Sequence, residues 1–170
     1  MGRKMKVKGL IDEDWVNYKK PSMYIAFPRC SFKCDKECGR QVCQNSALAN
    51  EKNIDIGIKT IINRYINNPI TKAVVCGGLE PFDSWEDLQQ LITYLRIRTN
   101  DDIVIYTGYY EEEIEDEKIE WLMSYGPIIV KYGRFIPDDE EYFNYELGVK
   151  LASKNQYTVR YMNENNSKSK

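Results

Sequence analysis

The stretch that decides the fold is TKAVVCGGLEPFDSWEDLQQLITYLRIRTNDDIVIY, residues 71–106. It starts with a β-rich apolar run at 71–76 and ends with a second one at Asp102–Tyr106. Between the two runs, a capping-box signal of Ser84 and Asp87 precedes apolar side chains at helical spacing. These apolar positions are Leu88, Leu91, Ile92 and Leu95. A strand, a helix and another strand in this order predict a right-handed crossover between two parallel strands.

The same alternation of strands and helices continues on both sides of this unit. We expect further strands at 5–10, Ser22–Phe27, 128–131 and Tyr157–Tyr161, and helices around 58–66 and 111–123. This order is typical of an α/β fold with a parallel sheet. With 170 residues the chain is too short for a complete eight-unit barrel, which needs ~250 residues. We expect a single domain over 1–162 and a flexible polar tail over 163–170.

Composition and charge exclude several classes of function. The 24 basic and 26 acidic residues leave a formal net charge of −2, so nothing indicates nucleic acid as a partner. No apolar run reaches the ~18 residues of a membrane span, and the basic N-terminus lacks the apolar core of a signal peptide. We therefore expect a cytoplasmic protein without membrane contact. Histidine is absent, which excludes histidine acid–base catalysis and histidine metal ligands.

Four of the five cysteines lie close together, at Cys30, Cys34, Cys38 and Cys43. In a reducing cytosol such a cluster indicates metal binding rather than disulfide bonds. Four thiolates can close a zinc site, or they can hold an iron–sulfur cluster. Two features favour the iron–sulfur cluster, with zinc as the alternative: the uneven spacing without paired C-x2-C knuckles, and the position of the loop at a strand end that faces glycine-rich segments. The fifth cysteine, Cys76, lies in a buried-type strand and is expected to be a core residue.

The other unusual residues follow the predicted strands. Gly77-Gly78-Leu79-Glu80-Pro81 comes after the run at 71–76, and Tyr106-Thr107-Gly108 ends the next strand. Lys131-Tyr132-Gly133 closes the strand at 128–131, and the cysteines follow Ser22–Phe27. Parallel strands place their carboxyl ends at one edge of the sheet, and ligands of α/β folds bind there. The sequence therefore predicts one binding site along this edge.

These motifs resemble those of the radical S-adenosylmethionine (SAM) enzymes. The likeness is strongest to the activating proteins of anaerobic ribonucleotide reductases, in the glycyl-radical activase group, and it covers residues 5–160. Cys30 and Cys34 match the first spacing of the family's C-x3-C-x2-C triad, and Cys43-Gln44-Asn45 resembles its end. Gly77-Gly78-Leu79-Glu80-Pro81 resembles a Gly-Gly-acid-Pro motif with a leucine inserted. Tyr106-Thr107-Gly108-Tyr109 resembles the fourth-strand region, and Lys131-Tyr132-Gly133-Arg134-Phe135 resembles an Asp-x-Gly-x-Phe/Tyr stretch with lysine in place of the acid.

The cysteine spacing departs from that family pattern. Eight residues, not two, separate Cys34 from Cys43, and Cys38 lies inside this insertion. We assign the cluster ligands as Cys30, Cys34 and Cys43, because Cys43 is followed by the Gln-Asn pair that resembles the end of the triad. Cys38, at an even spacing after Cys34, is the alternative third ligand.

The resemblance implies an incomplete βα barrel that holds a [4Fe-4S] cluster on three cysteines, with one iron left open for SAM. It implies that Gly77 and Gly78 present backbone carbonyls to the SAM amine and that Glu80 pairs with its ammonium group. Tyr106 and Thr107 would contact the ribose or adenine. Gly108 and Asn45 complete the expected cofactor-binding set.

The resemblance also implies an activity. The reduced cluster would cleave SAM to methionine and a 5′-deoxyadenosyl radical, which would take a hydrogen atom from a backbone glycine of a large anaerobic ribonucleotide reductase. A flavodoxin-type or ferredoxin-type protein would supply the electron. Two alternatives stay open on the sequence: a radical SAM enzyme that acts on a small molecule or a peptide, and a non-catalytic four-cysteine zinc module.

Overall fold

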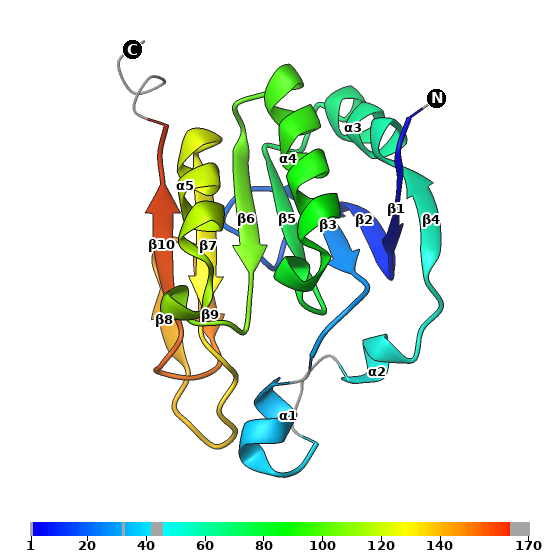
Figure 1. The fold of residues 1–170 in the computed structure, drawn as a ribbon. Coiled ribbons are helices and arrows are strands. Elements are labelled where there is room, and N and C mark those ends of the chain that lie inside the picture. Colours follow the sequence, from blue (N-terminus) through cyan, green and yellow to red (C-terminus); the bar gives the residue numbers. More distant parts are fainter. Residues whose placement is uncertain (1, 32, 42–45, 164–170) are drawn as a thin grey trace.

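The structure is a computed structural model that describes residues 2–31, 33–41 and 46–163. Its centre is a six-stranded sheet with the strand order β10-β7-β6-β5-β3-β2 (Figure 1). The strands are β2 (Gly9–Asp14), β3 (Ser22–Phe27), β5 (Ala73–Gly78), β6 (Asp102–Tyr106), β7 (Ile128–Tyr132) and β10 (Tyr157–Tyr161). The four central strands are parallel, and the edge strands β2 and β10 are antiparallel to their neighbours. The expected α/β class is confirmed, in the arrangement of a partial βα barrel.

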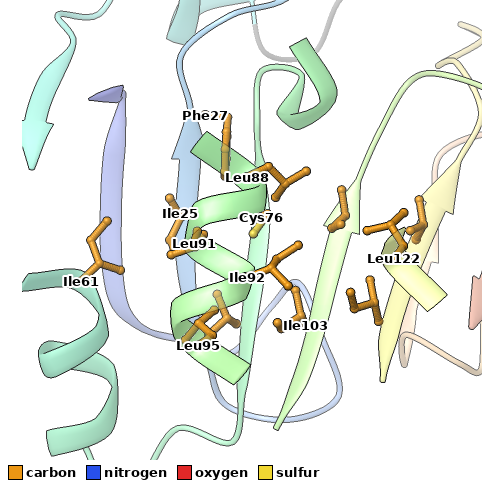
Figure 2. Close-up of a cluster of buried hydrophobic side chains, with 14 of the residues drawn as sticks. Ile25, Phe27, Ile61, Cys76, Leu88, Leu91, Ile92, Leu95, Ile103 and Leu122 are labelled. Atoms are coloured by element: carbon orange, nitrogen blue, oxygen red, sulfur yellow. The ribbon is translucent and has the colours of Figure 1, made fainter. Parts of the chain in front are cut away.

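Three helices cover one face of this sheet (Figure 1). They are α3 (Ile58–Asn67), α4 (Trp85–Arg98) and α5 (Asp116–Ser124). Helix α4 is the predicted crossover between β5 and β6, and its four predicted apolar side chains lie against the sheet (Figure 2). All four are at most 1% exposed, and burial of each contributes about 1.5–3 kcal/mol. No helix in the described part of the chain is long and apolar enough to cross a membrane.

Cys76 lies in the middle of the core beneath α4 (Figure 2). It belongs to β5, the strand between β3 and β6, and its side chain is 0% exposed. Burial raises the pKa of the Cys76 thiol to about 12. The prediction that Cys76 is a core residue is confirmed.

The opposite face of the sheet carries a second, smaller core. A hairpin of β8 (Tyr142–Asn144) and β9 (Val149–Leu151) packs on it, together with the connection between β2 and β3. The buried side chains of this cluster are Tyr18, Ala73, Val75, Val104, Ile129, Leu147 and Leu151. This cover fills the middle of the face, so the remaining space lies at the carboxyl ends of the strands.

Several short elements complete the described chain. They are β1 (Lys4–Val7), which pairs with β4 (Ile54–Gly57), the helices α1 (Lys33–Cys38) and α2 (Ser46–Ala49), and the 3-10 helices η1 (Pro81–Ser84) and η2 (Glu111–Glu113). The strand expected at 5–10 is two strands, because the chain bends at Lys8 and β1 and β2 pair with different partners. Helix α1 lies inside the segment that the sequence treats as a loop. Of the expected tail, only Asn163 lies in the described part.

The helix expected at 111–123 is wrong in its first half. The structure has η2 there, and α5 begins only at Asp116. Between them Ile114 has an extended backbone and a side chain that is 7% exposed. This residue joins the core, so the acidic run turns at Ile114 instead of continuing as a helix.

The capping box expected at Ser84 is also wrong. The Ser84 hydroxyl makes no capping hydrogen bond, and Asp87 accepts a hydrogen bond of 3.0 Å from Arg3 instead. The reason is that η1 leads into α4 without a break. The start of α4 therefore has no open first turn for a serine to cap.

The Gly-Gly pair at the end of β5 lies close to β3. Gly78 has a φ of +80°, and a Cβ added to it would lie 2.7 Å from Cα of Ala26. A Cβ on Gly77 would lie 2.7 Å from the hydroxyl oxygen of Tyr24, which accepts a hydrogen bond from the Gly78 amide. Strand packing and the positive φ therefore account for these glycines. No approaching ligand is needed to explain them.

We expect Gly78→Ala to lower the free energy of unfolding by about 2–4 kcal/mol, because a positive φ and an overlap with backbone atoms both oppose the new Cβ. Urea denaturation followed by tryptophan fluorescence measures this change. The control is Gly9→Ala in β2, whose added Cβ meets nothing within 4 Å. Equal stability of the two variants would contradict this account of the Gly-Gly pair.

Candidate functional site

A pocket of about 300 Å³ lies at the carboxyl ends of the parallel strands, on the face without helices. Six residues that the sequence analysis placed at the site line it: Cys30, Gly78, Glu80, Tyr106, Thr107 and Gly108. Gly77 precedes Gly78 in β5 and does not line the pocket. Asn45 lies outside the described residues. The structure thus brings together residues from the ends of three strands that are far apart in the sequence.

Glu80 joins the ends of β5 and β6. Its Oε1 accepts hydrogen bonds from the Thr107 hydroxyl at 2.8 Å and from the Phe82 amide at 3.1 Å. Its Oε2 accepts one from the Gly108 amide at 2.9 Å. Glu80 is only 5% exposed. A carboxylate that is buried in this way is held in one position by donors from two neighbouring loops.

The Glu80 carboxyl is short of a positive partner. Burial raises its pKa to about 7, although the hydrogen bonds that it accepts act in the opposite direction. Among the described residues, no lysine or arginine forms an ion pair with it. A ligand with an ammonium group would favour the charged carboxylate and offset its desolvation. The end of the pocket near Glu80 is therefore suited to a cation.

Thr107 and Tyr106 are already engaged in the protein itself. The Thr107 hydroxyl donates to Glu80 and accepts a hydrogen bond of 3.0 Å from the Tyr109 amide. The Tyr106 hydroxyl donates to the backbone carbonyl of Asn17, and burial raises the pKa of this phenol. These contacts shape the wall of the pocket. The expected contacts of both residues with a ribose or adenine stay predictions.

Asp83 contributes to the site although the sequence analysis does not single it out. Its Oδ2 accepts a hydrogen bond of 2.9 Å from the Ser31 amide, and its Oδ1 accepts one of 2.6 Å from the Tyr109 hydroxyl. The Glu80 amide also donates to the carbonyl of Arg29 at 2.6 Å. These bonds hold the start of the cysteine loop against the loop after β5. An acid two residues after the Gly-Gly-x-Glu-Pro motif, at the ligand-binding edge, is the signal that could have identified it.

The described cysteines of the loop differ in their surroundings. Cys30 is partly buried and lines the pocket, whereas Cys38, at the end of α1, is exposed. Cys34 lies in α1 with its side chain outside the described part, and Cys43 lies outside the described residues. Within the described part, no three cysteine, aspartate or glutamate side chains form a metal site. The ligand set of Cys30, Cys34 and Cys43 stays a prediction.

Lys131 supplies a positive group to the same pocket. It lies near the end of β7, where the family pattern has an acid, and it is 7% exposed. Its Nζ donates to the Gly133 carbonyl at 3.2 Å. The pocket therefore has a carboxylate from the loop after β5 and an ammonium group from β7. Such a pocket can accept a ligand that carries both charges.

Comparison with protein families matches residues 22–158 to the 4Fe-4S single cluster domain. The match begins at β3, includes the cysteine loop and all strand ends that line the pocket, and ends inside β10. No curated protein and no solved structure gave a match. Because the family match spans most of the chain, the protein belongs to the 4Fe-4S single cluster domain family and carries a cluster domain of the radical SAM type.

Proposed function

We propose that this protein is a radical SAM enzyme that generates a glycyl radical on an anaerobic ribonucleotide reductase. The observation that carries the proposal is the pocket, which is lined by Cys30 of the cluster loop and by the buried carboxyl of Glu80. When bound, the cluster supplies the electron that cleaves SAM into methionine and a 5′-deoxyadenosyl radical. The protein's own residues bind and orient the reactants.

The residues of the cysteine loop and of the pocket are chemically suited to a [4Fe-4S] cluster and SAM. Cysteine thiolates are the ligands of [4Fe-4S] clusters, and this loop has a cysteine at the edge of the pocket. The charged residues around the cysteines leave a net charge of +2, which favours thiolates: Arg29, Lys33, Lys36 and Arg40 against Asp35 and Glu37. The raised pKa of Glu80 marks a place for a cation in the same pocket.

Two charged side chains would orient the amino-acid part of SAM. Glu80 is assigned to its ammonium group, and Lys131 to its carboxylate. Tyr24, Tyr106 and Leu151 would exclude water from the remaining wall of the pocket. Exclusion of water matters because a carbon radical is protected from side reactions only in a closed site.

The shape of the fold supports a protein loop as the hydrogen donor. Helices cover one face of the sheet (Figure 1), and the pocket lies on the other face. In the described part of the chain the six strands form an open sheet and not a closed barrel. A glycine has no side chain, so its α-hydrogens can enter a narrow opening. A flavodoxin-type or ferredoxin-type protein is the proposed electron donor.

The first test is anaerobic reconstitution followed by metal analysis and EPR. We expect about four irons per chain and a spectrum of the reduced protein that changes when SAM is added. With reductant, SAM and the candidate reductase, we expect a glycyl-radical signal on the reductase and one methionine for each radical.

Other outcomes of this test separate the alternatives. One zinc ion per chain, or a cluster spectrum that SAM does not change, would contradict the radical SAM assignment. Cleavage of SAM without a radical on the reductase would overturn the proposed target and favour a small-molecule or peptide substrate.

The ligand set is tested by single serine substitutions. Cys30→Ser, Cys34→Ser and Cys43→Ser should each lose most of the iron, because one thiolate fewer cannot hold the cluster. Cys38→Ser should keep it, since Cys38 is exposed and lies inside the insertion. Iron content and the absorbance of the reconstituted protein report the result. The reverse outcome for Cys38 and Cys43 would establish Cys38 as the third ligand.

Glu80 should make SAM binding depend on pH. With a pKa of about 7, its carboxyl is largely protonated at pH 6 and largely ionised at pH 7.8. Only the ionised form pairs with an ammonium group, so the affinity for SAM should rise over this range. Glu80→Gln should weaken binding about tenfold and remove this rise, since it carries no charge at either pH.

Calorimetric titration of the reconstituted protein measures these affinities. The matched control is Glu86→Gln. The Glu86 side chain is 85% exposed and does not line the pocket that Glu80 lines. Its affinity for SAM and its pH dependence should match those of the unmodified protein. A pH dependence that survives in Glu80→Gln would exclude Glu80 as the titrating group.

A further inference from the structure

The insertion between Cys34 and Cys43 contains most of helix α1, which is held in place by other parts of the protein. Helix α1 has six residues, and a helix of this length is not stable alone in water. Contacts with the rest of the protein must therefore hold it. Two of these contacts come from the segment that follows β7, which lies beside α1 (Figure 1).

Arg134, in this segment, is a cation whose position is fixed by the body of the protein. Its two terminal nitrogens bind the two carboxylate oxygens of Glu113 at 2.6 and 2.9 Å. One of them also donates to the Gly108 carbonyl at 3.1 Å, and the guanidinium lies 4.8 Å from the centre of the Tyr110 ring. The side chain is 9% exposed. A forked, stacked guanidinium of this kind presents its remaining Nε in one fixed direction.

Glu37 of α1 forms an ion pair at this Nε, without the alignment of a hydrogen bond. Its Oε1 lies 2.7 Å from Nε of Arg134, although the Glu37 side chain is 56% exposed. A second ion pair joins the same two segments, between Arg40 and Asp138, at 4.0 Å and with both side chains largely exposed. The shorter pair, with one partner buried, is the stronger of the two attachments.

We propose that Arg134 is a positioning residue that fixes the cysteine-bearing helix α1 against the pocket through its ion pair with Glu37. This inference rests on the proposed function, because it gives the position of α1 a role in cluster and SAM binding. Gly133 and Phe135, on either side of Arg134, both line the pocket. The ion pair therefore couples the cluster loop directly to a wall of the pocket.

The same anchor sets the rotation of α1. Positions one turn apart in a helix share a face, so an ion pair at position 37 fixes which face of α1 is turned towards Arg134. Cys38, the next residue, is exposed. Arg134 itself does not line the pocket, and its guanidinium is occupied by Glu113, Gly108 and Glu37. It acts through α1 and not on a substrate.

Trypsin tests the anchor in the protein without a cluster. Lys33, Lys36 and Arg40 are cleavage sites within and beside α1. Loss of the ion pair in Glu37→Gln should speed cleavage at these sites about fivefold. Mass spectrometry of the released peptides measures the cleavage rate at each site. Asp138→Asn makes the same change of charge but removes only the exposed pair, and it should stay within about twofold of the unmodified protein. Unchanged cleavage of Glu37→Gln, or equal acceleration by both variants, would overturn the proposal.

A spectroscopic titration tests the positioning role. In the reconstituted protein, Glu37→Gln should keep its iron but need about fivefold more SAM to change the EPR spectrum, whereas Asp138→Asn should titrate normally. Equal SAM requirements for Glu37→Gln and the unmodified protein would refute the positioning role, whatever trypsin shows. If SAM changes no spectrum at all, including that of the unmodified protein, the proposed function fails, and so does the role in SAM binding. The trypsin result then still decides whether Arg134 holds α1.

Discussion

The burial of the Glu80 carboxyl is the constraint around which this site is organised. Removing a carboxylate from water is costly, and here the cost is offset by three hydrogen bonds from the loop after β5 and the end of β6. The compensation is incomplete, because the pKa is raised to about 7. Those donors fix the geometry of the two strand ends before any ligand binds. A cationic ligand supplies the missing compensation, so binding and the stability of this edge of the sheet are coupled.

The way in which the two faces of the sheet are covered determines where a ligand can bind. The strands of a parallel sheet need cover on both faces. Helices α3, α4 and α5 supply it on one face with a large aliphatic core (Figure 2). On the other face the β8–β9 hairpin and Tyr18 cover only the middle of the strands. The carboxyl ends on this face are left for the pocket, so the stable core and the functional site lie on opposite sides of the sheet.

The sequence predicts those features that depend on local periodicity. The crossover through α4, the central strands and the buried position of Cys76 follow from apolar patterns of helical or strand type. The same patterns fail for β8 and β9, which have three residues each, and for the turn at Ile114, which the core imposes. The sequence also places glycines at the end of β5, but the reason for Gly78 is the backbone of β3.

The parts of the site that sequence reasoning missed are pairs of residues far apart in the chain. Asp83 binds the amide of Ser31, and Arg134 binds Glu37. No periodicity relates such positions, and the sequence around each residue does not indicate its partner. What can be predicted is the edge of the sheet at which the partners meet, because the carboxyl ends of parallel strands lie together.

These two contacts explain together how the chain tolerates its unusual cysteine spacing. Ordering each additional loop residue costs about 1–2 kcal/mol of backbone entropy, so a longer cysteine loop needs attachments that a short one does not. Asp83 holds the loop at its start, on the side of β5, and Arg134 holds it at α1, on the side of β7. On the proposed ligand set, the Arg134–Glu37 pair is the added anchor that matches the added length of the loop.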